Sequence, residues 1–154
     1  MTQPNMAHMA PTAAPRTFRK KVTITSTQLL ALNATPQELV PAPGAGFALI
    51  FKGALIQKPA GTAYVEDATD DLSVSYTDAS GLEVGRVDST GFLDQTTNQI
   101  RFVNPYHAAS GLSGITPVVN AALVLHLKNG EIITGDSDLN IEVLYDVVDT
   151  TPAV

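Results

Sequence analysis

The sequence predicts an all-β protein: an antiparallel β-sandwich or jelly roll with about eight to ten short strands, one short helical turn and a flexible N-terminal arm. Short segments alternate apolar and polar side chains with a period of two, as strands that cover one side of a core do. Turns rich in Gly, Pro, Asn and Asp separate these segments. No segment has the helical period of a long amphipathic helix. With 154 residues the chain is long enough to bury the core of one domain.

We divide the chain into a flexible basic arm at residues 1–20, a β-sandwich or jelly-roll domain at residues 21–149 and a C-terminal tail at residues 150–154. The first sixteen residues contain three prolines and no periodic apolar pattern. Such a segment buries too little apolar surface to offset the entropy of ordering it, so we expect it to be flexible.

The domain begins with a strand pattern at residues 22–25 (VTIT). Ser26 is the predicted N-cap of one helical turn, which Pro36 ends because proline cannot continue a helix. Residues 38–40 are predicted to be extended, and residues 41–46 (PAPGAG) to form a turn.

Residues 47–57 (FALIFKGALIQ) are apolar at odd and even positions alike. This pattern predicts a strand covered on both sides, either between sheets or beneath a neighbouring subunit. Gly53 predicts a bulge or bend within it. Residues 72–76 and 82–87 are predicted strands, joined by a hairpin connection at residues 77–81 (TDASG).

The middle of the chain holds shorter strand candidates at residues 63–66, 92–93 and 99–103. Residues 104–120 contain two prolines and two glycines, and we expect a long irregular loop there.

Two strands are predicted near the C-terminus. The first is residues 121–128, which Asn129–Gly130 should join in a hairpin to residues 131–134. Residues 139–148 show the clearest alternation in the chain and form the second. The predicted core comprises Phe47, Leu49, Phe51, Leu123, Leu125, Ile141, Val143 and Tyr145.

Charge is divided unevenly along the chain. Residues 1–21 have a net charge of +4 from Arg16, Arg19, Lys20 and Lys21, and the other 133 residues hold 5 basic and 15 acidic residues, a net charge of −10. An acidic body argues against nucleic acid as the main partner, because binding phosphates requires a basic surface. The four basic residues are candidates for contact with a protein partner; the alternative is a solvated tail.

Composition narrows the class of protein further. There is no Cys, so disulfides and thiolate metal sites are excluded. No apolar run is long enough for a membrane span or a signal peptide, and we expect synthesis in a cytoplasm. Charged residues are only 16% of the chain, which suits a protein that packs against neighbours.

Candidate sites for chemistry are few, and we predict no enzyme activity, cofactor or metal. Residues 135–138 (GDSD) are predicted to be the bend before the last strand, with an ion site as the alternative, and the same choice applies to residues 66–71 (EDATDD). His126 shares its strand face with Val124 and lies opposite the leucines, so it should point away from the core. A catalytic triad would need a nucleophile elbow, and none is present.

Two segments resemble parts of small virion structural proteins of tailed bacteriophages. TITSTQLLALNATPQELVPAPGAG (23–46) resembles their opening strand and turn, and ALVLHLKNGEIITGDSDLNIEVLYDVVD (122–149) resembles their closing strands. The resemblance covers most of residues 20–149 and is more specific for a phage particle than for a part of it.

Proteins of this type include capsid decoration, or cement, proteins. The resemblance implies a trimer on the outside of the head that stabilises contacts between major capsid protein subunits, located in the virion and made in the host cytoplasm. The partners implied are the major capsid protein and other copies of the chain, with neither nucleic acid nor a membrane. The alternatives are a tail-associated or receptor-binding virion protein and, less favoured, a small jelly-roll enzyme or lectin.

Overall fold

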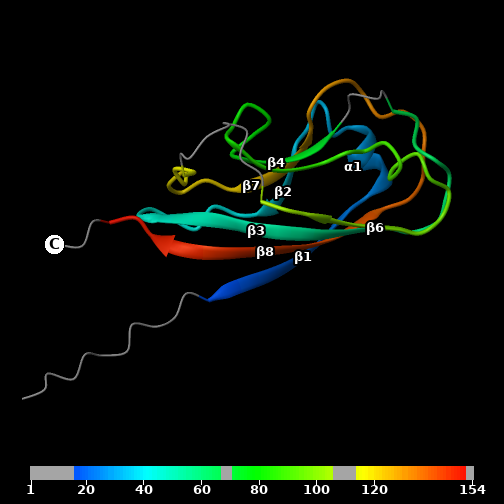
Figure 1. Cartoon of the computed structure of the whole chain (residues 1–154). Coiled ribbons are helices and arrows are strands. Elements are labelled where there is room, and N and C mark those ends of the chain that lie inside the picture. The colour runs from blue at the N-terminus through cyan, green and yellow to red at the C-terminus, as the bar shows by residue number, and fades with distance from the viewer. Residues whose placement is uncertain (1–15, 67–70, 106–113, 152–154) are drawn as a thin grey trace, which may run out of the picture.

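The computed structural model describes residues 16–66, 71–105 and 114–151. In these stretches eight strands and one short helix form a sandwich of two four-stranded antiparallel sheets (Figure 1). One sheet has the order β1-β8-β3-β6 and the other β2-β7-β4-β5. The elements are β1 (Thr17–Ile24), α1 (Ser26–Leu30), β2 (Gln37–Val40), β3 (Phe47–Lys58), β4 (Leu72–Tyr76), β5 (Glu83–Val87), β6 (Gln99–Val103), β7 (Leu123–Leu127) and β8 (Leu139–Asp149).

The strand pairing is that of a jelly roll. Within the sheets β1 pairs with β8, β2 with β7, β3 with β6 and β4 with β5, all antiparallel. The first four strands thus run beside the last four in reverse order, like one long hairpin wound into two facing sheets. The predicted all-β fold, with eight strands and one helical turn in the described residues, is confirmed.

A bulge accounts for part of the apolar character of β3 at both odd and even positions. A bulge shifts the register between Phe51 and Gly53, and Gly53 has a positive φ of 136°. Because a bulge inserts one extra residue, it reverses which alternate positions face inward. The side chains in the core are Leu49 and Phe51 before the bulge and Ala54 and Ile56 after it.

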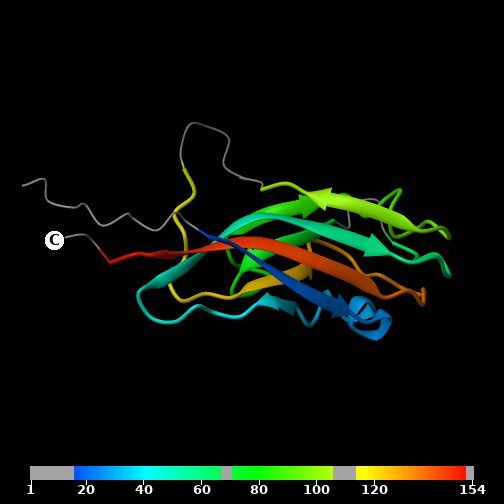
Figure 2. The same ribbon diagram turned by 90° about the horizontal axis from the view of Figure 1, so that it is seen from below.

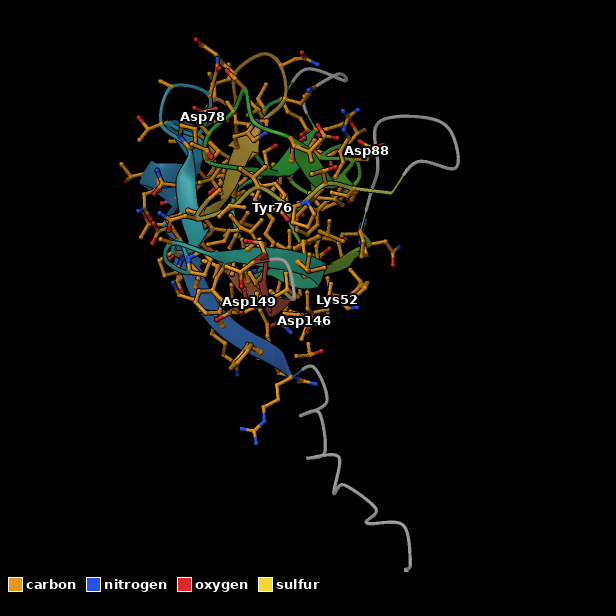
Figure 3. All side chains as sticks on the ribbon, turned by 90° about the vertical axis from the view of Figure 1, so that its left-hand side faces the viewer. Lys52, Tyr76, Asp78, Asp88, Asp146 and Asp149 are labelled. Carbon is orange, nitrogen blue, oxygen red and sulfur yellow. The ribbon has the colours of Figure 1, made fainter. Side chains whose placement is uncertain are left out.

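The core fills the space between the sheets, as the alternation in the strands predicts. Leu72, Val74 and Tyr76 of β4 meet the inward residues of β7 and β8 there. Tyr76 points between the sheets (Figure 3), and its hydroxyl donates a hydrogen bond to the backbone carbonyl of Leu49 in the facing sheet. This contact satisfies the one polar atom of the side chain, so the ring can be buried without an unpaired group.

Six of the eight predicted core residues are buried, and two are not. Phe47 is 41% exposed, and Tyr145 is half-buried. β3 has 12 residues and β8 has 11, whereas the strands of the facing sheet have four or five. The long strands therefore have ends that the shorter sheet does not cover, which alternation alone does not reveal.

The helical turn starts one residue earlier than predicted. Its N-cap is Thr25, whose side chain accepts a hydrogen bond from the backbone N–H of Gln28, while the side chain of Gln28 accepts one from the backbone N–H of Thr25. Three residues after Ser26 stands Leu29, which cannot complete this reciprocal pair. The capping box therefore selects Thr25.

The predicted hairpin at Asn129–Gly130 is wrong. β7 lies between β2 and β4, and the segment after Gly130 bridges at Ile133 to Val65 instead. Both backbone hydrogen bonds of this bridge, Val65 N to Ile133 O at 2.8 Å and Ile133 N to Val65 O at 2.9 Å, join loops 68 residues apart in the chain. Residues 63–66 and 131–134 accordingly contribute one bridge and no regular strand.

Residues 92–93 are also not a strand. The backbone N–H groups of Phe92 and Leu93 both donate to the carbonyl of Ser89, which forms a tight turn. Both side chains are fully buried, so this turn contributes to the core although it is not a strand. Two adjacent apolar residues have no period, and the sequence offered no means of separating a turn from a strand here.

Candidate functional site

The basic residues predicted for partner contact lie on β1 or just before it. β1 pairs with β8 from Thr17 opposite Asp146 to Ile24 opposite Leu139, and Phe18 stacks on Tyr145 with ring centroids 5.7 Å apart. The predicted arm boundary at residue 20 is therefore wrong, because residues 17–20 are held in the sheet. Residues 1–15, the rest of the predicted arm, lie outside the described residues.

Alternation along β1 separates these cations onto two sides of the strand. Arg19 and Lys21 stand opposite Leu144 and Glu142 on the outer face of the sheet, and Lys20 stands opposite Val143 on the inner side. Arg19 is paired with Glu142 at 3.1 Å, but such an exposed ion pair contributes little to stability. Within the described stretches, Arg16, Lys20 and Lys21 have no ion-pair partner, so their charge is available to a ligand.

The outer face of the β1-β8-β3-β6 sheet carries side chains that we call the apolar stripe: Ile50, Leu55, Ile100, Phe102 and Leu144. Figure 2 looks onto this face, with β6 at one margin and β1 at the other. Ile100 is 54% exposed and Phe102 49%, whereas Leu55 and Leu144 are half-buried. A contiguous exposed apolar group on one face is typical of an interaction surface.

The bulge of β3 shapes the centre of the stripe. A Cβ atom on Gly53 would stand 2.7 Å from Cζ of Phe102 and 3.0 Å from the carbonyl oxygen of Val103. The ring of Phe102 therefore lies directly against the bare backbone of the bulge, a seat that only glycine provides.

Polar side chains border the stripe. Lys52 Nζ lies 3.8 Å from an Asp146 carboxylate oxygen, and Figure 3 shows these residues of the two central strands β3 and β8 side by side. A shallow hollow between Arg19 and Phe102 is lined also by Leu55, Glu142 and Leu144. An apolar centre with a charged rim is the usual anatomy of a protein–protein interface.

The bend lies at Thr134, just before the GDSD segment, and Gly135 has a positive φ; the aspartates of GDSD bond to distant loops. Asp136 accepts hydrogen bonds from the backbone N–H of Thr62 at 2.7 Å and from its hydroxyl at 2.9 Å, and these two bonds lower the pKa of Asp136. Asp138 accepts a hydrogen bond at 2.8 Å from the backbone N–H of Ser26, the first residue of α1. Both carboxylates are thus engaged by neutral donors of the protein.

Tyr64 makes a further hydrogen bond to the GDSD segment. Its hydroxyl donates a 2.5 Å hydrogen bond to the carbonyl of Ser137, and burial, with Asp138 and Asp136 nearby, raises the pKa of Tyr64 to about 12. The phenol therefore stays protonated and keeps donating. Gly135 has a positive φ of 99°, and the ring of Tyr64 occupies the place that a side chain at residue 135 would need.

No ion site is found where the acidic segments are described. In residues 16–66, 71–105 and 114–151, no three His, Cys, Asp or Glu side chains lie close enough together to hold a metal ion. Residues 67–70 of the EDATDD segment lie outside the described residues. The hydrogen bonds of Asp136 and Asp138 give GDSD a structural role, and most of EDATDD lies outside the described residues.

His126 points away from the core, as predicted, but it is not exposed. It is 2% exposed, and its Nε2 lies 2.9 Å from Oγ of Ser75 on the neighbouring strand β4. Its Nδ1 lies 3.1 Å from the carbonyl of Leu127, so we assign the proton to Nδ1 and take Nε2 as the acceptor for the Ser75 hydroxyl. A serine beside a histidine can form a nucleophile pair, but with both residues buried no substrate reaches it here.

Glu66 has the most perturbed carboxyl group among the described residues. Both carboxylate oxygens are buried. Burial raises the pKa of Glu66 to about 7; the nearby Ser89 hydroxyl counteracts this shift, and Asp94 and Asp88 add to it. Neither oxygen has a hydrogen-bond partner among the described residues, so the Ser89 hydroxyl does not offset the effect of burial.

Sequence reasoning found the basic residues but not the apolar stripe. Ile100 and Phe102 alternate with Gln99 and Arg101, and this alternation shows that one face is apolar without showing which face is inward. Val103 is the residue that distinguishes the two faces. It is apolar and alternates with Phe102, and because Val103 is buried, Phe102 and Ile100 point outward.

Comparison with protein families, with curated proteins and with solved structures finds no match. No helix of the described residues is long and apolar enough to span a membrane.

Proposed function

We propose that this protein is a bacteriophage capsid decoration, or cement, protein that binds the outside of the head as a trimer and stabilises contacts between major capsid protein subunits. The resemblance of residues 23–46 and 122–149 to phage virion proteins gives the class of particle. The observation that carries an assembly role is the apolar stripe, exposed at Ile100 and Phe102 and bordered on β1 by Arg19 and Lys21.

The two features serve different contacts in this proposal. The apolar stripe buries against another copy of the chain, and the cations of β1 bind the shell protein. Repetition on a lattice turns individually weak contacts into stable attachment, because each bound copy holds the next near its site. Binding to the assembled shell and not to its free subunits shifts the equilibrium towards the intact shell.

Adding the protein to purified heads tests the proposed function. Added to purified heads that lack it, the protein should co-sediment with them and raise the temperature at which they release their DNA. A tail-associated or receptor-binding protein, the alternative, would instead be found on tails by labelling in electron micrographs. Absence from heads, or binding without any gain in shell stability, would contradict the cement function.

The mass of the protein in solution tests whether the apolar stripe forms the contact between copies. We expect light scattering behind size exclusion to give about three times 16.2 kDa for the natural chain. Replacing both Ile100 and Phe102 with serine should give a monomer with an unchanged circular dichroism spectrum, because both side chains are about half exposed and contribute little to the core. Leu82→Ser, at an exposed leucine on the β4–β5 connection, is the control and should remain trimeric. A trimer that survives the double change would remove the stripe from the interface.

A further inference from the structure

We propose that the open edge of β1 binds an extended acidic segment of another protein by strand addition. This inference rests on the proposed function, since it specifies how the cations of β1 would hold the shell protein. It follows from the hydrogen-bonding capacity of the edge, from the placement of charge along it and from the composition of the strands and ends of this chain.

The edge of β1 is free to accept a strand. Among the described residues β1 is the end strand of its sheet and pairs with β8 alone, over all eight residues from Thr17 to Ile24. Alternate N–H and C=O groups of an end strand point away from the sheet, and an extended peptide can pair with them. At eight residues, β1 is the longest end strand of the two sheets as described, since β2, β5 and β6 have four or five residues.

The charges along this edge specify an acidic ligand. Lys21 and Arg19 project on the outer side of β1, and Lys20 projects on the inner side. A strand added beside β1 places its own alternate side chains next to these, so carboxylates on either of its faces meet a cation. Phe18, 44% exposed on the inner side, adds one apolar contact between the charged positions.

The termini and the end strands of this chain do not supply such a segment. Two β1 edges brought together would place like charges opposite one another, which disfavours their pairing. Among the other end strands, β2 has the single acid Glu38, β5 has Glu83, which is already bound to Arg86 and Lys128, and β6 has none. Residues 1–15 and 150–154 contain no acidic side chain. The proposed strand is accordingly one from a different protein.

A peptide experiment tests the inference without phage particles. The probe is an eight-residue peptide of alternating glutamate and valine with blocked ends, added to the isotope-labelled full-length protein. Backbone amide exchange of residues 17–24 is followed by nuclear magnetic resonance. We expect alternate amides of β1, those at the open edge, to exchange at least about tenfold more slowly at saturating peptide, because they gain a hydrogen-bond partner.

Variants that lack particular cations, and ligands other than the glutamate–valine peptide, test the specificity of this binding. Changing Lys20 and Lys21 to glutamine should weaken binding of the peptide about tenfold, as expected for the loss of two partly screened charge contacts. Lys128→Gln, which removes a cation just after β7 of the other sheet, should leave binding unchanged. An alternating lysine–valine peptide tests a ligand of opposite charge. An oligothymidylate tests a nucleic acid in place of a peptide.

The outcomes separate the inference from the proposed function. Failure of the glutamate–valine peptide to slow β1 exchange, equal binding of the lysine–valine peptide, or a preference for the oligothymidylate would each overturn strand addition. Head binding that is unaffected by the Lys20 and Lys21 changes would also overturn it, while the cement function would stand. Slowed exchange in a protein that ignores heads would uphold the open edge and refute the cement function.

Discussion

Replacing Gly135 with alanine is expected to lower the free energy of unfolding by about 3 to 4 kcal/mol, combining backbone strain with overpacking. The new Cβ would stand 2.2 Å from Cδ1 and 2.4 Å from Cε1 of Tyr64. The ring cannot swing away at little cost, because it is buried and its hydroxyl is bonded to the carbonyl of Ser137. The positive φ of 99° adds the strain that any residue with a Cβ incurs in this region.

Gly91→Ala is the matched control for this change. Gly91 also has a positive φ, of 74°, but a Cβ there would meet nothing within 4 Å. Its replacement should therefore cost only about 1 kcal/mol, the strain alone. Urea titration followed by circular dichroism gives both values, and the melting temperature should fall by roughly 10 °C for Gly135→Ala. Equal losses for the two variants would show that Tyr64 does not hold the GDSD segment in place.

The strands of this fold could be predicted where alternation is regular and several residues long. The segments 72–76 and 139–148 were found because Val74 and Ile141 lie in the middle of alternating runs whose apolar side faces the core. Within a hairpin the partner is also near in sequence, so the pairing of β4 with β5 followed from the turn between them.

Pairing across long stretches of sequence could not be predicted. The Asn129–Gly130 turn indicates a local hairpin, yet Ile133 pairs with Val65 because the jelly roll already places β2 and β4 on the two edges of β7. The partners of Asp136 and Asp138 are likewise distant: Thr62 is 74 residues away, and Ser26 is 112. A local pattern carries no information on such contacts, so the anchoring role of these aspartates needed the structure.

Only part of the candidate site could be predicted from the sequence, for a related reason. Net charge identifies Arg16, Arg19, Lys20 and Lys21 from the sequence alone. Their place in a strand depends on the packing of Phe18 against Tyr145. A single apolar residue among charged ones is too weak a pattern to predict this contact. A jelly roll by itself is compatible with many functions, so the proposed role rests on these surface residues and on the resemblance, not on the fold.

Glu66→Gln is expected to reduce the loss of stability that accompanies a rise in pH from about 4.5 to 7. The pKa of Glu66 is raised from its ordinary 4.5 to about 7 in the folded protein, chiefly by burial. In that interval the folded state binds more protons than the unfolded state, so the contribution of this group is fully present below pH 4.5 and is lost as pH rises through about 7. The sign is thus opposite to that of a carboxylate in an ion pair.

The expected size of the effect is about 1 to 2 kcal/mol, less than the full shift would give because the side chain as a whole is only partly buried and is screened by solvent. At pH 8 the Gln variant should be more stable than the natural chain by this amount, and at pH 4 the two should be nearly equal. Urea titrations across this range measure the difference, with Glu131→Gln, at an exposed glutamate, as the control. A difference that does not change with pH would mean that Glu66 ionises normally and that its carboxylate is reached by water.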